Sequence, residues 1–85
     1  MKTFQYTITD EVGIHARPAG NLVKEAKKYA SRITVTCAEK TADATGLLSL
    51  MGLGVKKNTE VTVQVEGEDE EQAAAAIEAF FRENL

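Results

Sequence analysis

The sequence predicts an α+β fold in which one β-sheet carries helices on a single face. Some segments alternate apolar and polar residues, as strands with one buried face do, whereas others repeat apolar residues at helical spacing. Their order along the chain is strand, helix, strand, strand, short helix, strand, helix. Because 85 residues leave room for only one hydrophobic core, we expect a single domain over residues 1–85.

The first half of the chain predicts a strand, a helix and a strand pair. Residues 4–9 alternate and are expected to form a strand, and a loop follows over residues 10–14. Helical spacing then predicts a helix over residues 16–29. Alternation returns over residues 32–37, and residues 40–44 are expected to form a short strand that pairs back onto them. The side chains expected to face inward are Phe4, Tyr6, Ile8, Ala19, Leu22, Val23, Ala26, Ile33, Val35 and Cys37.

The second half predicts a short helix, a strand and a closing helix. Residues 47–51 are apolar and precede two glycines, which favours a short helix, although a strand remains an alternative. Residues 60–66 alternate and predict a strand, and the alanine-rich residues 70–83 predict a helix. Asp69 and Gln72 have the spacing of a capping box at its start. The inward side chains expected here are Val61, Val63, Val65, Ala73, Ile77, Phe80 and Phe81.

The composition excludes several classes of function. One His and one Cys cannot build a zinc site of the usual type, so we expect no metal and no cofactor. A single Cys also excludes an internal disulfide framework and favours a reducing, cytoplasmic location. We expect no membrane insertion, because there is no long apolar run and no signal-peptide core. The net charge of −3 argues against nucleic-acid binding.

The charge is distributed unevenly between the two halves. Residues 1–40 carry seven Lys and Arg against four Asp and Glu, whereas residues 41–85 carry three against nine. Within the first predicted helix, Arg17, Lys24 and Lys28 fall in one narrow stripe. We expect this stripe to face an acidic partner protein, although an ordinary solvated face fits the charge pattern equally well. Gly20, beside the stripe, and Lys27, in the predicted last turn, belong to the same expected partner face.

His15 is the candidate reactive residue. Pro18 is tolerated in a first helical turn, so the helix is expected to begin near residue 16 and His15 to lie at its N-terminal end. The free backbone N–H groups of Ala16 and Arg17 would attract a phosphate there, and the Arg17 guanidinium would add a permanent charge. A neutral imidazole in this position can attack phosphorus. The alternative is that His15 is an ordinary surface or capping residue.

The apolar segment after Gly46 is the second candidate site. With Leu53 it carries five large apolar side chains, which exceed what one short helix can bury, and Leu50 and one neighbour are expected in the core. We therefore expect some of Leu47, Leu48 and Met51 to be exposed, which is typical of a protein contact. The alternative is that all of them fold into the core.

The segment Gly13-Ile14-His15-Ala16-Arg17-Pro18-Ala19 resembles the active-site signature of the HPr family, the histidine-containing phosphocarriers of the bacterial sugar phosphotransferase system. The resemblance covers nearly the whole chain, including Leu53-Gly54, the acidic turn at residues 66–69 and the closing helix. It implies an open-faced β-sandwich, with a four-stranded antiparallel sheet and three helices packed on one face. It also implies a stoichiometric carrier, not an enzyme, and a monomer.

The resemblance assigns roles to individual residues. It implies that His15 accepts a phosphoryl group on Nδ1 from phosphorylated Enzyme I, itself charged by phosphoenolpyruvate. His15 would then pass the group to a histidine on an enzyme IIA domain of a sugar permease. Arg17 matches the phosphate-stabilising arginine of the family. Leu47, Leu48 and Met51 match its apolar patch for these partners, and regulatory proteins are further candidate partners.

One position departs from the family pattern. Members from low-GC Gram-positive bacteria carry a regulatory serine that an ATP-dependent HPr kinase phosphorylates, and the matching residue here is Gly46. We expect that switch to be absent, and we do not expect the neighbouring Thr45 or Ser49 to replace the serine. Three other functions remain open: a related phosphocarrier in a nitrogen-linked relay, an acylphosphatase-like hydrolase, and a regulator that binds a transcription factor without covalent chemistry.

Overall fold

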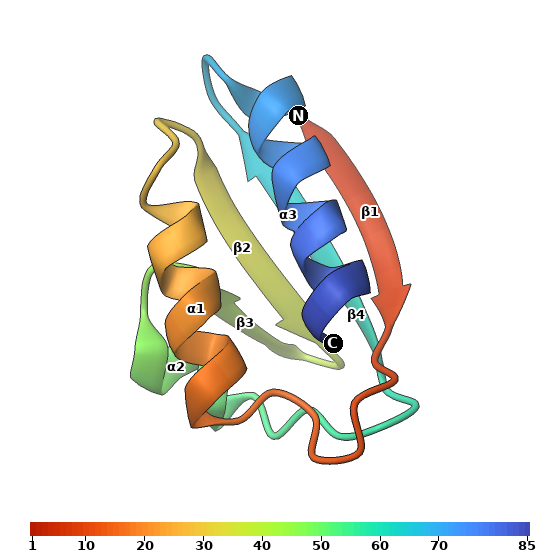
Figure 1. The fold of residues 1–85 in the computed structure, drawn as a ribbon. Helices are drawn as coiled ribbons and strands as arrows, with labels where there is room; N and C mark the ends of the chain where they lie inside the picture. Colours follow the sequence, from red (N-terminus) through yellow and green to blue (C-terminus); the bar gives the residue numbers. More distant parts are fainter.

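The structure is a computed structural model that describes residues 1–85. It consists of a four-stranded antiparallel sheet with three helices on one face (Figure 1). The elements are β1 (Lys2–Thr7), α1 (Ala16–Ala26), β2 (Arg32–Cys37), β3 (Lys40–Asp43), α2 (Leu47–Gly52), β4 (Glu60–Glu66) and α3 (Glu70–Asn84). The strand order is β1-β4-β2-β3, so β4 pairs with both β1 and β2, and β3 forms one edge. The predicted fold class, element order and open sheet face are confirmed. No helix is long and apolar enough to cross a bilayer.

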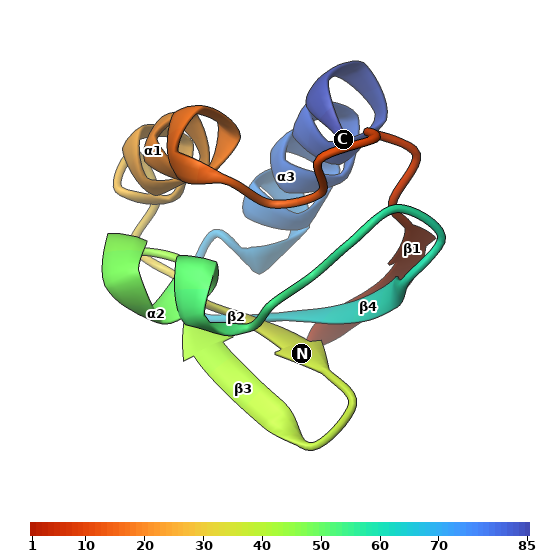
Figure 2. The ribbon, with the colours of Figure 1, turned by 90° about the horizontal axis from the view of Figure 1, so that it is seen from below.

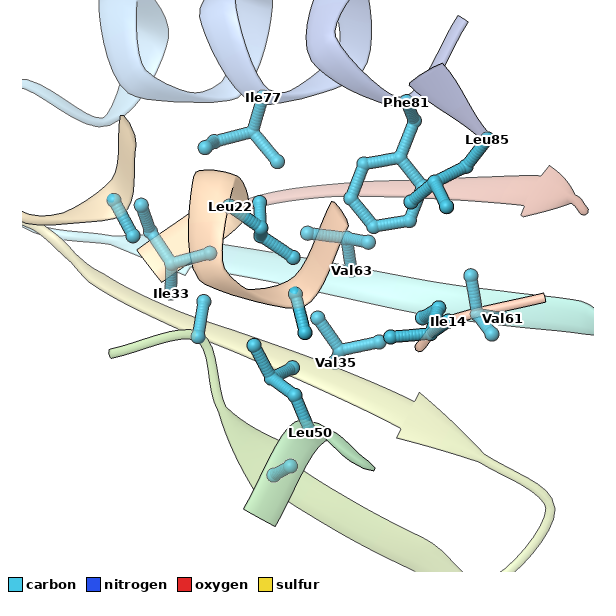
Figure 3. Close-up of a cluster of buried hydrophobic side chains, with 14 of the residues drawn as sticks. Ile14, Leu22, Ile33, Val35, Leu50, Val61, Val63, Ile77, Phe81 and Leu85 are labelled. Atoms are coloured by element: carbon cyan, nitrogen blue, oxygen red, sulfur yellow. The ribbon is translucent and has the colours of Figure 1, made fainter. Parts of the chain in front are cut away.

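The core lies between the sheet and the helices. Val61, Val63 and Val65 of β4 point to the helical side, and none of them is accessible to solvent. Between these valines, β4 presents polar residues to the open face, as strict alternation in a one-sided sheet requires. Ile77 and Phe81 of α3 cover the valines from the helical side (Figure 3). Leu22 of α1 is fully buried in the same core, which thus holds α1 and α3 at a fixed position over the sheet.

Five side chains predicted to face inward are only half-buried. Phe4 and Tyr6 lie on β1, an edge strand, and meet the Phe81 ring in edge-to-face contacts with centroids 5.9 and 5.7 Å apart. The half-buried set is Phe4, Tyr6, Val23, Cys37 and Phe80.

The strand β1 begins at Lys2 and ends at Thr7, two residues earlier than the predicted end. Directly after it, the Ile8 N–H donates to the carbonyl of the loop residue Thr59.

The first helix is shorter than predicted. It ends at Ala26 instead of residue 29, and the N–H groups of Lys28 and Tyr29 donate to carbonyls three residues back, as in a tightening last turn. The prediction that Lys27 and Lys28 lie in its last turn is therefore wrong: both lie beyond its end. Lys28 also forms an ion pair with Glu25 at 3.3 Å, so it is not a free member of the basic stripe.

Asp69 does not cap α3 in the predicted way. Its side chain makes no capping hydrogen bond within α3, so the predicted capping box is wrong. The carboxylate instead accepts hydrogen bonds from the backbone N–H groups of Ala30 and Ser31, both at 2.9 Å, and from the Ser31 hydroxyl. These bonds tie the start of α3 to the turn before β2. They explain why α1 ends before the predicted residue 29: the Asp69 carboxylate accepts the N–H groups of the turn, which therefore need no helical carbonyl.

Asp69→Asn is expected to lower the melting temperature at neutral pH. The Ser31 hydroxyl bond, followed by the Ala30 and Ser31 amide bonds, lowers the pKa of Asp69 below its usual 3.8. The stabilisation is therefore complete above the ordinary pKa and is lost as the pH falls through the lowered folded-state value. Thermal melts at several pH values test this, with the exposed neighbour Glu68→Gln as control. A difference between Asp69→Asn and wild type that persists unchanged into strong acid would contradict it.

Candidate functional site

His15 occupies the N-cap position of α1. Its backbone is extended (φ −117°, ψ −174°) and its carbonyl accepts the first helical hydrogen bond, from the Ala19 N–H at 2.9 Å. Pro18 is buried in the first turn and has no N–H to satisfy, which confirms the predicted helix start. The His15 side chain is 40% exposed, so an incoming phosphoryl donor can reach the ring.

The first turn of α1 is positive and carries no acidic residue. The N–H groups of Ala16 and Arg17 have no acceptor inside the helix, because their partners four residues back would lie outside it. Arg17 is exposed and adds a full charge at the end of the helix where the macrodipole disfavours cations. By contrast, α3 begins with Glu70 and Glu71, as the macrodipole favours. The free N–H groups and Arg17 at the start of α1 thus favour a bound anion, although this arrangement does not stabilise the helix itself.

His15 and Arg17 line a depression of about 180 Å³ on the surface. Every residue of its lining is polar or proline: Asp10, His15, Arg17, Pro18, Asn21 and Asn84. Asp10 Oδ1 lies 4.0 Å from His15 Nε2. Asp10, Asn21 and Asn84 were not predicted as site residues. Helical spacing places Asn21 one turn after Arg17, but nothing in the sequence points to Asn84, 69 positions away from His15.

The loop before His15 is anchored to two distant segments. The N–H of Ile14 donates to the Val55 carbonyl at 3.2 Å, and the N–H of Asp10 donates to the Leu85 carbonyl at 2.9 Å. The loop therefore passes beside the C-terminal end of α3, as Figure 2 shows. Two backbone contacts thus hold the loop on either side of Gly13 and fix where His15 enters the helix.

The predicted partner side chains lie on two neighbouring helices, except Lys27, which follows the last residue of α1. Leu47 and Met51 of α2 are each 40% exposed and Leu48 is 82% exposed, while Leu50 is fully buried, as expected. Lys24 is exposed on α1, and α1 packs against α2 (Figure 2). The apolar side chains of α2 thus lie next to α1, the helix whose N-cap is His15.

Neither a positive φ nor close packing requires glycine at the two predicted site positions, Gly20 and Gly46. A methyl group added at Gly20 would meet no atom within 4 Å, so packing within the chain does not explain this glycine. Gly46 is the N-cap of α2 at a negative φ of −108°, where any residue fits. The neighbouring Thr45 hydroxyl is engaged, donating to Asp43 Oδ1 at 2.6 Å. This bond is the largest of the causes that lower the pKa of Asp43.

Known proteins resemble the chain in both sequence and structure. The model of the family described as the PTS HPr component phosphorylation site matches residues 2–83. The phosphocarrier protein HPr of Lysinibacillus sphaericus is 47% identical over 83 residues, covering 98% of this chain and 94% of that protein. A solved histidine-containing phosphocarrier protein from Mycoplasma superimposes with a TM-score of 0.93 at 40% identity, covering 96% and 93% of the two chains. A solved HPr dimer from Thermoanaerobacter tengcongensis reaches 0.77 at 35% identity, covering 98% and 95%.

Proposed function

Because the chain belongs to the HPr family of phosphocarriers of the phosphotransferase system, we propose that it carries a phosphoryl group on His15 between Enzyme I and enzyme IIA domains of sugar permeases. One observation carries the assignment to His15: it is the chain's single histidine, and it lies at the start of α1 beside Arg17 and unpaired N–H groups. These are the groups that a phosphoryl anion needs around it.

The transfer itself needs only a nucleophile and an anion site. The lone pair of His15 Nδ1 attacks the phosphorus of the donor phosphohistidine, and the electron pair of the breaking N–P bond returns to the donor ring. The transferred group then lies at the start of α1, where Arg17 and the N–H groups of residues 16 and 17 balance its charge. Passing the group to enzyme IIA is the same step in reverse, with His15 as the leaving group.

A relay assay tests this function. Phosphoenolpyruvate and Enzyme I should label the protein, and the isolated phosphoprotein should lose its label to a sugar IIA domain faster than it hydrolyses alone. Comparing this rate with that to a nitrogen-linked IIA domain separates the two relays. Multiple turnover of an acyl phosphate by the isolated protein would instead favour a hydrolase, and a labelled protein that transfers to no IIA domain would contradict the proposal.

Gly46→Ser is expected to fold normally and to become a substrate of an ATP-dependent HPr kinase, whereas the wild type is not. A side chain at residue 46 would meet Ser49 Oγ at 3.4 Å and the Asp43 carbonyl at 3.5 Å, which are ordinary contacts. Exchanging glycine for serine at an N-cap changes stability by only a few tenths of a kcal/mol. Phosphate incorporation from ATP tests this, with Gly52→Ser at the other end of α2 as control. Equal labelling of the wild type would show that Thr45 or Ser49 is used instead.

Gly20→Ala is expected to raise the free energy of unfolding by about 0.5–1 kcal/mol, because an interior helix glycine is replaced where there is space for a methyl group. If a partner approaches α1 closely at this point, the more stable variant will transfer phosphate more slowly. Urea unfolding and the relay assay measure the two effects separately. A stable variant with unchanged transfer to both partners would remove Gly20 from the partner face.

A further inference from the structure

Asp10 faces the reactive ring. Its Oδ1 lies 4.0 Å from His15 Nε2, and no other carboxylate lies within that distance of the ring. The side chains are 33% and 40% exposed, so both lie at the open mouth of the depression. Because Nε2 is the nitrogen on the Asp10 side, a proton on Nε2 is favoured by the negative carboxylate.

The carboxylate is held in this orientation by its own loop. Oδ1 accepts the N–H of Val12 at 2.8 Å, and the Asp10 carbonyl accepts the N–H of Gly13 at 3.1 Å. The Asp10 N–H donates to the Leu85 carbonyl, so the end of α3 also fixes its backbone. An exposed aspartate without such bonds would sample several rotamers, whereas this one is directed at Nε2 before any partner binds.

We propose that Asp10 is a positioning residue that keeps the single proton of neutral His15 on Nε2 and so leaves the Nδ1 lone pair free to receive the phosphoryl group. This inference rests on the proposed function of His15. A neutral imidazole carries one N–H, and a carboxylate that faces one ring nitrogen favours the tautomer with the proton on that nitrogen. A proton on Nδ1 would block the attack.

Asp10 also balances charge during the transfer. When the Nδ1–P bond forms, the ring keeps its Nε2–H and becomes an imidazolium, whose positive charge faces the Asp10 carboxylate. When the bond breaks, the electron pair returns to Nδ1 and the ring leaves as a neutral imidazole with the proton still on Nε2. No proton therefore needs to enter or leave in either direction.

Asp10→Asn tests this by nitrogen NMR of the imidazole at alkaline pH. An exposed charge contact predicts that the ratio of Nε2–H to Nδ1–H tautomer falls about two- to five-fold, and that phosphoryl acceptance slows by a similar factor. Glu11→Gln removes the same charge from the adjacent position and should change neither. Asp10→Ser, whose hydroxyl can still accept the Val12 N–H, should repeat the effect and guards against misfolding of the first variant.

The outcomes separate this inference from the proposed function. An unchanged tautomer ratio in both Asp10 variants overturns it, and so does a changed ratio with an unchanged rate of acceptance. The NMR measurement needs no phosphoryl donor. If the wild type accepts no phosphoryl group, the proposed function fails. If the wild type is labelled and both variants behave like Glu11→Gln, only the role of Asp10 fails.

Discussion

Gly13→Ala is expected to lower the free energy of unfolding by about 2–5 kcal/mol. Gly13 has a φ of +78°, and a methyl group there would lie 2.1 Å from the Val55 carbonyl oxygen and 2.8 Å from the Lys56 Cα. Those atoms belong to backbone, so they cannot rotate away as a flexible side chain would. The loop must shift instead, and the hydrogen bond between the Ile14 N–H and the Val55 carbonyl shifts with it.

Gly54→Ala is the matched control for this prediction. Gly54 also has a positive φ, of +68°, but a methyl group there would meet nothing within 4 Å. Backbone strain alone then costs about 1–2 kcal/mol. Urea unfolding of both variants separates strain from steric overlap. Equal losses in the two variants would contradict the close packing of Gly13 against the Val55 segment.

Arg17→Ala is expected to slow phosphoryl transfer to His15 about 10- to 100-fold with little change in stability. Arg17 is exposed, so its removal opens no cavity, and it relieves a cation at the positive end of α1. A hydrogen bond to a charged group and a preorganised anion contact each have an effect of this size. The phosphorylated variant should also hydrolyse at a different rate from the wild type, because the phosphoryl group has lost its counter-charge.

Arg32→Ala provides the control for Arg17. Arg32 is exposed as well, but it lies in β2 on the open face of the sheet, away from α1. Removing it deletes the same charge from the chain without touching the depression at His15. Rapid-quench measurement of label transfer from Enzyme I distinguishes the two variants. If they slow transfer equally, the effect comes from overall charge, and the local role of Arg17 is wrong.

The sequence predicts the fold well where an element buries one face and its apolar residues follow that face. β4 is central and strictly alternating, so its buried valines were correctly identified. The prediction failed where long-range contacts decide an end. The Asp69 carboxylate, 38 positions from Ser31, helps to end α1, and pairing with β4 extends β1 over the polar residues Lys2 and Thr3. Local patterns contain neither contact.

Local signals predict only part of the candidate site. The sequence predicts His15 and Arg17 because the signals for a helix start, a proline and an anion-binding side chain lie within four consecutive residues. The sequence predicts Asp10 only as a loop residue, because four residues of irregular backbone separate it from His15 and their path depends on the contacts to Val55 and Leu85. Asn84 reaches the depression only because α3 ends beside that loop. The places of Asp10 and Asn84 beside His15 follow only from the tertiary structure.

If His15 carries the phosphoryl group, the mass of the intact protein must change after incubation with phosphoenolpyruvate and Enzyme I. We predict that the wild type gains one phosphoryl group, which acid removes and base does not, and that His15→Ala gains none. A wild type that stays unmodified, or a His15→Ala variant that gains the same group, would contradict the claim.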